Sequence, residues 1–423
     1  MRELRQAKHN KWRALTRVSQ AGCLVAVAAV VALFGQPTHA AQDVAWKEQA
    51  GSGAKNWSTL ASSNDGTKLV AAVNSGSIYT SADSGVTWKE QTVAGLAGPQ
   101  KWTAVASSAD GTKLAAFYQW GGYMYTSNDS GATWMKNGLP GAAGDWVSAT
   151  SSADGTKLAV VGRGSKVFTS ENSGATWKEQ ANPGAKNWSS IASSDDGTKL
   201  AATVTDGSIY TSTDSGVTWK EQTSSGTKKW SAIASSADGA KLVATVNGGR
   251  VYTSTDSGAT WKEQDTADRA WTAVASSADG TKLAATVTDG SIYTSDDGGA
   301  TWTESENTGP NAWTAIAMSA TGDKLAAALN GGNIRTATAK DKPVTPPAPA
   351  PTPSPTPAPT PTPEPAPATE PAPAAAPAAE SAAPAKHEEP TLADTGDSVW
   401  LVAALAASGL GAGSFWFVKS RKS

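Results

Sequence analysis

Residues able to perform acid–base or nucleophilic chemistry are unevenly distributed along this 423-residue chain. Its three histidines are His9, His39 and His387, and its single cysteine is Cys23, so all four lie toward the two ends. Histidine is the commonest general base and transition-metal ligand at neutral pH. The middle of the chain therefore cannot perform Ser-His-Asp hydrolysis, and zinc catalysis is disfavoured. We expect no cofactor and no disulfide.

Carboxylates, in contrast, recur at a fixed place in the middle of the chain. The pattern Ser-x-Asp-x-Gly-x-Thr-Trp occurs five times, and once more with asparagine in the aspartate place; these residues are Asp83, Asp129, Asn172, Asp214, Asp256 and Asp297. A short carboxylate or amide accepts hydrogen bonds from turn amides, and glycine supplies the left-handed conformation of such a turn. We therefore interpret these residues as structural turn formers and assign no catalytic residue among them.

The pattern resembles the Asp-box (BNR) repeat of a family of β-propellers that includes the sialidases. By that resemblance, a sialidase-like site has three arginines that clamp a carboxylate, a Tyr/Glu nucleophilic pair and an acidic proton donor. The repetitive region contains only Arg163, Arg250, Arg269 and Arg335, and these do not share a strand position. Any other glycosidase needs two suitably placed carboxylates. A non-catalytic role is therefore the preferred interpretation, and a glycoside hydrolase is the alternative.

A longer repeat must position these turns. Seven tryptophans recur every 41–45 residues and each opens a strand-like run: Trp57, Trp102, Trp146, Trp188, Trp230, Trp271 and Trp313. In six repeats an Asp-Gly pair follows, which predicts a tight hairpin with both turn residues at positive φ. Two further strands, the Asp-box turn and a fourth strand complete a unit the size of one propeller blade.

The seventh repeat is incomplete. Residues 334–338 reach its third strand, and no Asp-box follows. At the other end of the repetitive region, Trp46-Lys47-Glu48-Gln49 copies the fourth strand of other repeats. We therefore expect an all-β, seven-bladed β-propeller over residues 41–342. Its N-terminal strand would complete the last blade and remove the exposed sheet edges.

The repeats differ from one another mainly in two sets of loops. The Asp-Gly and Asp-box turns lie at one end of the blades and are nearly identical, whereas the loops at the opposite end vary. Binding residues tend to lie on loops above a rigid scaffold. The candidate ligand face consists of Tyr118, Trp120, Tyr123, Arg163, Asp206, Arg250 and Arg269. The three aromatic side chains could stack on a sugar or a partner's apolar surface, or instead pack against the neighbouring blade.

The N-terminal segment has the features of an export signal. Six basic residues precede an apolar run at positions 23–34, and Thr38-His39-Ala40 supplies small residues for signal peptidase. The run is too short to be a membrane span. Cys23 comes before the apolar run instead of after it, which argues against lipidation. We expect residues 1–40 to be a cleaved signal peptide.

The C-terminal segment, residues 391–423, resembles a sortase sorting signal. The motif Leu392-Ala393-Asp394-Thr395-Gly396 is followed by an apolar stretch to Val418 and a basic tail. The family pattern is Leu-Pro-x-Thr-Gly, and Ala393 replaces the proline, as in signals of some actinobacterial sortases. By this resemblance, sortase cuts the Thr395–Gly396 bond and joins Thr395 to peptidoglycan, so the transmembrane helix holds the chain only before sorting. A simple tail anchor is the alternative.

Residues 343–390 connect the repetitive region to this signal. The tract is rich in Pro, Ala, Thr and Glu, so it can bury no core and favours disordered polyproline II conformations. At about 3.1 Å per residue its reach is on the order of 150 Å, which suits a stalk through a thick cell wall. Both ends of the chain therefore predict export to the cell wall of a Gram-positive-type bacterium.

Two functions of different class remain. The preferred one is an adhesin-like binding protein that presents the variable face to an extracellular glycan or protein; the alternative is a wall-tethered glycoside hydrolase. The formal net charge of −2 provides no basic footprint for nucleic acid. The chain also resembles propellers that assist the assembly of photosynthetic complexes, but a wall anchor disfavours that role. The sequence contains no ligand set with calcium spacing, so we assign no metal site.

Overall fold

The computed structural model describes residues 42–96, 98–120, 122–139 and 144–341. These residues form 28 β-strands and two 3-10 helices, Ala50–Ser52 and Thr223–Ser225. Within these ranges no helix combines the length and the apolar character needed to cross a membrane. The predicted signal peptide, stalk and sorting motif all lie outside the described residues.

The strands fall into seven units, each with four strands paired in antiparallel order. The first strands are β2 (Lys55–Ser62), β6 (Gln100–Ser107), β10 (Asp145–Ser151), β14 (Trp188–Ser193), β18 (Lys228–Ser235), β22 (Arg269–Ser276) and β26 (Asn311–Met318). The second strands are β3 (Leu69–Gly76), β7 (Leu114–Tyr118), β11 (Leu158–Arg163), β15 (Leu200–Gly207), β19 (Leu242–Gly249), β23 (Leu283–Gly290) and β27 (Lys324–Gly332).

The third and fourth strands are shorter in most units. The third strands are β4 (Ile78–Ser81), β8 (Tyr123–Ser127), β12 (Phe168–Ser170), β16 (Ile209–Ser212), β20 (Val251–Ser254), β24 (Ile292–Ser295) and β28 (Arg335–Asp341). The fourth strands are β5 (Lys89–Gln91), β9 (Met135–Gly138), β13 (Lys178–Glu179), β17 (Lys220–Gln222), β21 (Lys262–Glu263), β25 (Thr303–Glu304) and, for the last unit, β1 (Gln42–Glu48). We number the units 1 to 7 in the order of their first strands.

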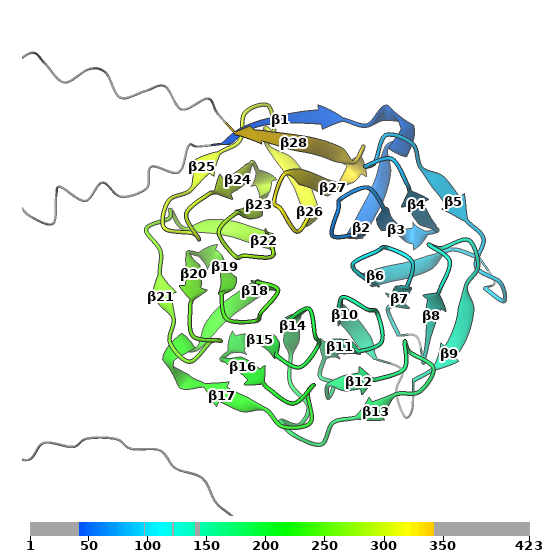
Figure 1. Ribbon diagram of the computed structural model, residues 1–423, viewed down its shortest axis with the longest axis horizontal. Coiled ribbons are helices and arrows are strands. Elements are labelled where there is room, and N and C mark those ends of the chain that lie inside the picture. Colours follow the sequence, from blue (N-terminus) through cyan, green and yellow to red (C-terminus); the bar gives the residue numbers. More distant parts are fainter. Residues whose placement is uncertain (1–41, 97, 121, 140–143, 342–423) are drawn as a thin grey trace, which may run out of the picture. The chain divides into compact units, whose positions relative to one another are not determined.

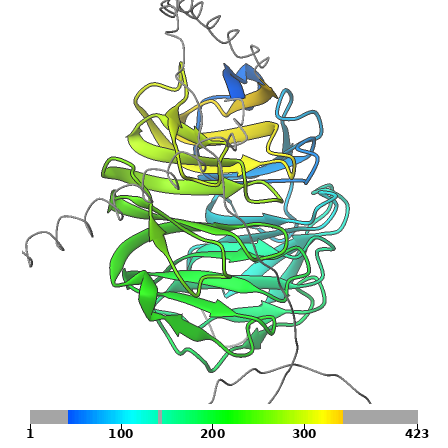
Figure 2. The same cartoon turned by 60° about the vertical axis from the view of Figure 1, so that its left-hand side comes forward.

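The units are arranged around a centre, as in a β-propeller. Figure 1 shows the first strand of each unit nearest the centre and the fourth strand on the outside, and Figure 2 shows the sheets stacked side by side from another direction. In unit 7, β1 pairs antiparallel with β28, with Trp46 opposite Ala337. Each first strand also has an irregular register just after its opening tryptophan, for example between Trp188 and Ser190.

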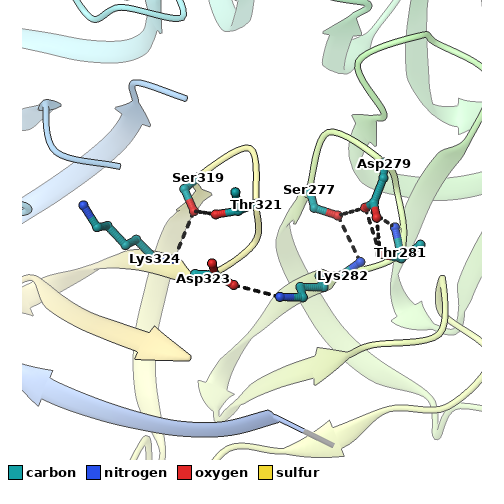
Figure 3. Close-up of polar contacts among 8 residues, drawn as sticks. All are labelled: Ser277, Asp279, Thr281, Lys282, Ser319, Thr321, Asp323 and Lys324. Carbon is teal, nitrogen blue, oxygen red and sulfur yellow. Dashed lines mark hydrogen bonds and ion pairs between the residues drawn. The ribbon is translucent and has the colours of Figure 1, made fainter. Parts of the chain in front are cut away.

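The turn between first and second strands differs from the predicted hairpin. In unit 6, six residues separate β22 from β23, and only Gly280 among them has positive φ, at 67°. The expectation of a two-residue turn with both residues left-handed was therefore wrong. Instead, Asp279 accepts hydrogen bonds from Ser277 Oγ (2.6 Å) and from the backbone N–H of Thr281 (2.9 Å), as Figure 3 shows. This side-chain network holds a wider turn, so only one residue must be left-handed.

The core is divided among the interfaces between neighbouring units. The opening tryptophans are at most 1% exposed. Trp188 contacts Tyr210 edge-on at 5.6 Å and Trp219 at 6.1 Å. The cluster around these rings also contains Val161 and Val167 from unit 3. The sheets therefore stabilise one another through apolar area buried between them, and each turn or loop is fixed on a rigid edge.

Candidate functional site

The two ends of the units form two different faces. The turns between first and second strands and between third and fourth strands lie at one end, which we call the Asp-turn face. The loops between second and third strands and between consecutive units lie at the opposite end, which we call the loop face. The loop face contains all seven predicted ligand residues, and the Asp-turn face contains the six Asp-box residues.

On the Asp-turn face, the Asp-box residues close their own turns. Asp129 accepts hydrogen bonds from the backbone N–H of Thr133 (2.8 Å), from Thr133 Oγ1 (2.6 Å) and from Ser127 Oγ (2.8 Å). These bonds, led by that of the Thr133 hydroxyl, lower the pKa of Asp129 to about 2. In unit 3, Asn172 accepts from the Thr176 N–H and donates to Thr176 Oγ1, both at 2.8 Å. An amide therefore replaces the carboxylate, as a turn former allows and a catalytic acid does not.

The seams between units on this face contain small cavities. Three of them have volumes of about 350, 270 and 420 Å³ and lie between units 7 and 1, 5 and 6, and 1 and 2, respectively. Their linings combine turn residues with the aliphatic ends of strands, and none of the seven predicted ligand residues takes part. No group of three His, Cys, Asp or Glu side chains able to hold a metal ion is present among the described residues.

On the loop face, a polar pair recurs in six units. A residue just before the third strand forms a hydrogen bond or an ion pair with the glutamate of the fourth strand. The pairs are Ser77–Glu90 (2.6 Å), Lys166–Glu179 (2.5 Å), Ser208–Glu221 (2.8 Å), Arg250–Glu263 (3.6 Å), Ser291–Glu304 (2.5 Å) and Asn333–Glu48 (2.5 Å). In units 1, 4 and 6 the serine hydroxyl is the leading cause of a lowered pKa of the glutamate. The glutamates of these three units are thus held ionised and paired.

Three predicted ligand residues belong to repeated structural contacts of this face. Arg269 lies over the Tyr293 ring at 4.4 Å, as Lys55 lies over Tyr79 at 5.2 Å in unit 1. Arg250 forms ion pairs with Glu263, Asp265 and Asp268 at 3.5–3.6 Å. Asp206 has φ of 55° and takes the left-handed position of its loop. These positions have a structural explanation and need no ligand.

Unit 2 departs from the pattern of the other units. In place of the glutamate it has Lys136, whose Nζ lies 3.7 Å from the ring centroid of Tyr123. Tyr123 itself takes the place of the donor residue and is 46% exposed. Trp120 is 64% exposed and has φ of 61°. The equivalent left-handed positions in the other units have Ser75, Gly164, Asp206, Gly248, Asp289 and Gly331.

Tyr118 has a different environment from the other two aromatic residues. It contacts Trp102 edge-on at 5.7 Å and Tyr125 at 6.3 Å, so its ring packs within unit 2. Burial is the leading cause of the raised pKa of its hydroxyl. Tyr118 therefore belongs to the packing of unit 2 and offers less ring area to a ligand than Trp120 or Tyr123.

The loop of Trp120 is fixed to the neighbouring unit. The Trp120 N–H donates to the carbonyl of Gly144 (3.0 Å), and Gln119 Nε2 donates to Asp145 Oδ1 (2.9 Å). Asp145 also forms an ion pair with Arg163 at 3.2 Å. The structure therefore connects Trp120 and Arg163 across units 2 and 3, whereas Asp206, Arg250 and Arg269 lie in units 4, 5 and 6, farther around the ring (Figure 1).

We call Trp120, Tyr123 and Lys136 the unit 2 platform. Lys136 was not among the residues selected from the sequence. A signal was present, because Met135-Lys136-Asn137 stands where other units have Lys-Glu-Gln, as at 220–222. The pairing of Lys136 with Tyr123, however, depends on the register of two strands, and the repeat pattern alone does not display it.

Comparisons with known proteins support the β-propeller fold. A family model described as the DUF6242 beta propeller domain matches residues 154–274. No curated protein matches the chain. A solved structure of YCF48 bound to D1 peptide is similar with a TM-score of 0.56 and 15% identity, and the similarity covers 71% of this chain and 97% of that one. YCF48 from Cyanidioschyzon merolae also gives a TM-score of 0.56, with 18% identity over 69% of this chain and 98% of that chain.

A glycoside hydrolase is also among the similar structures. The GH74 xyloglucanase from Xanthomonas campestris has a TM-score of 0.55 and 17% identity, and the similarity covers 69% of this chain and 53% of that enzyme. At such identities the likeness shows the fold alone. The chain is therefore an all-β protein with a propeller fold, and its role must be argued from its own residues.

Proposed function

We propose that this chain is an exported, wall-anchored binding protein whose seven-bladed propeller, built from Asp-box repeats, presents the unit 2 platform to an extracellular ligand. Sortase and the peptidoglycan precursor would act at Thr395, as the sorting motif predicts. Ring closure and the position of the platform, on the face opposite the ends of the described chain, support this function, and the exposed tryptophan of the platform carries it.

Closure of seven blades is supported by two independent sets of contacts. The N-terminal strand β1 pairs with β28 from Gln42–Asp341 to Glu48–Arg335. Near the centre, one backbone N–H of each unit donates to a backbone carbonyl of the next unit at 2.7–2.8 Å. Residue 320 of unit 7 donates to residue 64 of unit 1 and so completes the series, whose members are residues 64, 109, 153, 195, 237, 278 and 320. A ring closed in this way exposes no sheet edge at a gap between blades.

Strand order fixes the face on which the described chain begins and ends. A third strand runs from the loop face toward the Asp-turn face, so β28 ends at the Asp-turn face. Strand β1, as a fourth strand, begins at that same face. Both ends of the described chain therefore lie on the face opposite the unit 2 platform.

Trp120 is the observation that carries the binding function. A bulky residue in the left-handed region costs about 1–2 kcal/mol, because its Cβ approaches the following carbonyl oxygen. Three of the six equivalent positions avoid this cost with glycine, and the other three have the smaller residues serine or aspartate. A tryptophan that is both strained and 64% exposed contributes little to folding. Strained, exposed aromatic residues on rigid loops are typical of binding sites.

The enzyme alternative receives less support. A glycosidase needs a general acid whose pKa is raised toward neutrality. The glutamates of units 1, 4 and 6 instead have lowered pKa values, with the serine hydrogen bonds as the leading cause. Burial raises the pKa of Asp195, with a smaller effect from neighbouring Asp196, but this residue lies on the Asp-turn face away from the platform. Hence we propose a non-catalytic role.

A glycan array tests this proposal. The full chain, captured through a C-terminal tag, should bind a subset of glycans, and Trp120→Ala should remove that binding while the melting temperature stays the same. Ser75→Ala, at the equivalent loop position of unit 1, is the matched control and should bind like the wild type. Binding that persists in Trp120→Ala, or hydrolysis of a bound glycan, would contradict the proposal. Absence of glycan binding would redirect the search to protein ligands of the same platform.

A further inference from the structure

The unit 2 platform differs from the other units in charge as well as in aromatic content. The six other fourth strands place a carboxylate at this position: Glu48, Glu90, Glu179, Glu221, Glu263 and Glu304. Unit 2 places Lys136 there, so the charge at this point of the loop face is inverted. This change is specific to the unit that also carries Trp120 and Tyr123.

In the part of the chain that the structure describes, no carboxylate neutralises Lys136. None of the ion pairs within the described residues includes Lys136, and its side chain is exposed. Its ammonium group lies 3.7 Å from the Tyr123 ring centroid, where the ring's negative face attracts it. That contact leaves the positive charge uncompensated at the surface. An anionic group that approaches the platform would therefore gain a charge-assisted interaction.

The neighbouring cation is neutralised within the protein. Arg163 forms its ion pair with Asp145, which also accepts from Gln119. Lys136, in contrast, takes part in no ion pair of the described residues and lies against the exposed ring of Tyr123, on the unit that also carries the exposed Trp120. Exposed aromatic rings together with a cation outside any ion pair suit a sugar ring with an acidic substituent, because the sugar's C–H face stacks on the indole while the cation binds the anion.

A peptide ligand fits these observations less well. Peptide recognition commonly uses an open sheet edge or a groove with side-chain pockets. Trp120, Tyr123 and Lys136 line none of the three seam cavities between units. They form an open surface on a short loop and an outer strand pair. Such a surface favours a ligand that stacks flat.

We propose that the unit 2 platform binds a saccharide that carries an anionic group, with Trp120 and Tyr123 as stacking residues and Lys136 as the residue that selects the charge. This inference rests on the proposed function and names the ligand class for the same site. Its chemistry predicts a preference for acidic over neutral forms of one sugar, and the preference should weaken as salt increases.

The test uses pairs of probes that differ only in charge. The full chain is immobilised and exposed to oligogalacturonate and its methyl ester, to sialyllactose and lactose, and to sulfated and unsulfated oligosaccharides. We expect at least one acidic member to bind about tenfold or more tightly than its neutral partner. Lys136→Glu, which restores the residue type of the other units, should abolish that preference. Glu221→Lys, the reverse change in unit 4, should leave the binding of every probe unchanged.

The outcomes separate this inference from the proposed function. Equal binding of acidic and neutral partners, or a preference for the acidic partner that remains in Lys136→Glu, would overturn the inference of an anionic saccharide ligand. If such binding still depends on Trp120, the proposed binding function of the unit 2 platform is supported. If no saccharide binds but an acidic peptide binds in a Trp120-dependent manner, the inference of a saccharide ligand is also overturned, whereas the proposed binding function is supported. No Trp120-dependent binding of any probe would overturn both proposals. Melting temperatures of all variants show whether each remains folded.

Discussion

The Asp-turn face and the loop face differ in how much their contacts vary from one unit to the next. On the Asp-turn face, five lysines reach across to a backbone carbonyl of the next unit at 2.8–3.0 Å, as Lys241 does to Asp279. On the loop face, the donor–glutamate pair recurs in six units and is replaced in unit 2 by Tyr123 and Lys136. The Asp-turn face thus repeats the same lysine contact between units, whereas the loop face has a different pair of side chains in unit 2.

In unit 7, a sequence change in the turn of the Asp-turn face is compensated by a new contact. Its turn exchanges the two polar residues, with Thr321 in the aspartate place and Asp323 in the threonine place. Lys282 then binds Asp323 Oδ1 at 2.8 Å in place of a backbone carbonyl, as Figure 3 shows. The bridge between units 6 and 7 is therefore retained by another acceptor. In unit 2 of the loop face no such compensation occurs, and the side chains remain exposed.

The largest expected effect contrasts two tryptophans of the same chain. Trp219 is 8% exposed and donates to the Gly216 carbonyl at 2.9 Å. Its replacement by alanine should lower the free energy of unfolding by about 3–5 kcal/mol, because a large buried side chain is lost. Trp120→Ala should change it by less than about 0.5 kcal/mol. Urea denaturation of both variants measures the difference. Near-equal effects would refute the contrast between a structural and a functional tryptophan.

Acid should weaken the Asp-turn face before it affects the platform. Hydrogen bonds from neighbouring hydroxyls lead the lowering of pKa to about 2 for five carboxylates: Asp65, Asp110, Asp129, Asp154 and Asp196. The pKa of an unfolded aspartate is about 3.9. Because the folded pKa is the lower one, these groups stabilise the fold above about pH 4, and that stability is lost as pH falls toward about 2.

Melting temperature as a function of pH checks this expectation. It should be nearly constant between about pH 7 and 5 and should fall steadily between about pH 4 and 2. Asp129→Asn, which introduces the residue type that unit 3 has naturally at Asn172, should lower stability at neutral pH and reduce the slope in acid. A melting temperature that rises below pH 4 would contradict the sign derived from the pKa shifts.

The smallest expected effect separates stability from binding. Trp120→Gly removes the left-handed strain of about 1–2 kcal/mol and adds an entropy cost of about 0.5–1 kcal/mol. The free energy of unfolding should therefore stay the same or rise by up to about 1.5 kcal/mol, while glycan binding is lost. Thermal denaturation and the glycan array measure the two quantities. A clear loss of stability would indicate that Trp120 is part of the structural core.

The repeat pattern allowed much of the fold to be predicted. The spacing of the opening tryptophans and the turn residues led to four strands per unit, because each local choice repeats many times. The geometry of the turn between first and second strands could not be predicted from the sequence as well as the strands. The network of Ser277, Asp279 and Thr281 widens the turn, so the short hairpin predicted from Asp-Gly did not form. Competing side-chain acceptors of this kind are local, yet a rule based on two residues overlooks them.

The candidate site shows where sequence reasoning reached its limit. The variable loops pointed to Trp120 and Tyr123, and both are exposed. The same reasoning also selected Arg269 and Tyr118, whose side chains lie over Tyr293 and against Trp102. These contacts join strands that are well separated in sequence. A pattern of loop variation cannot distinguish such packing residues from exposed ones.

The sequence by itself determined the period, the strand count of each unit and the residue types that close the turns. It did so because turn formation and strand alternation are local properties. Only the tertiary structure decided which variable side chains are covered and which remain free. Strand register places Lys136 opposite Tyr125, from where its ammonium group lies over the ring of Tyr123. The contact of Gln119 with Asp145 across two units fixes the loop of Trp120. The physical reason is that exposure and charge compensation depend on neighbours in space, and the next unit contributes some of the neighbours of each unit.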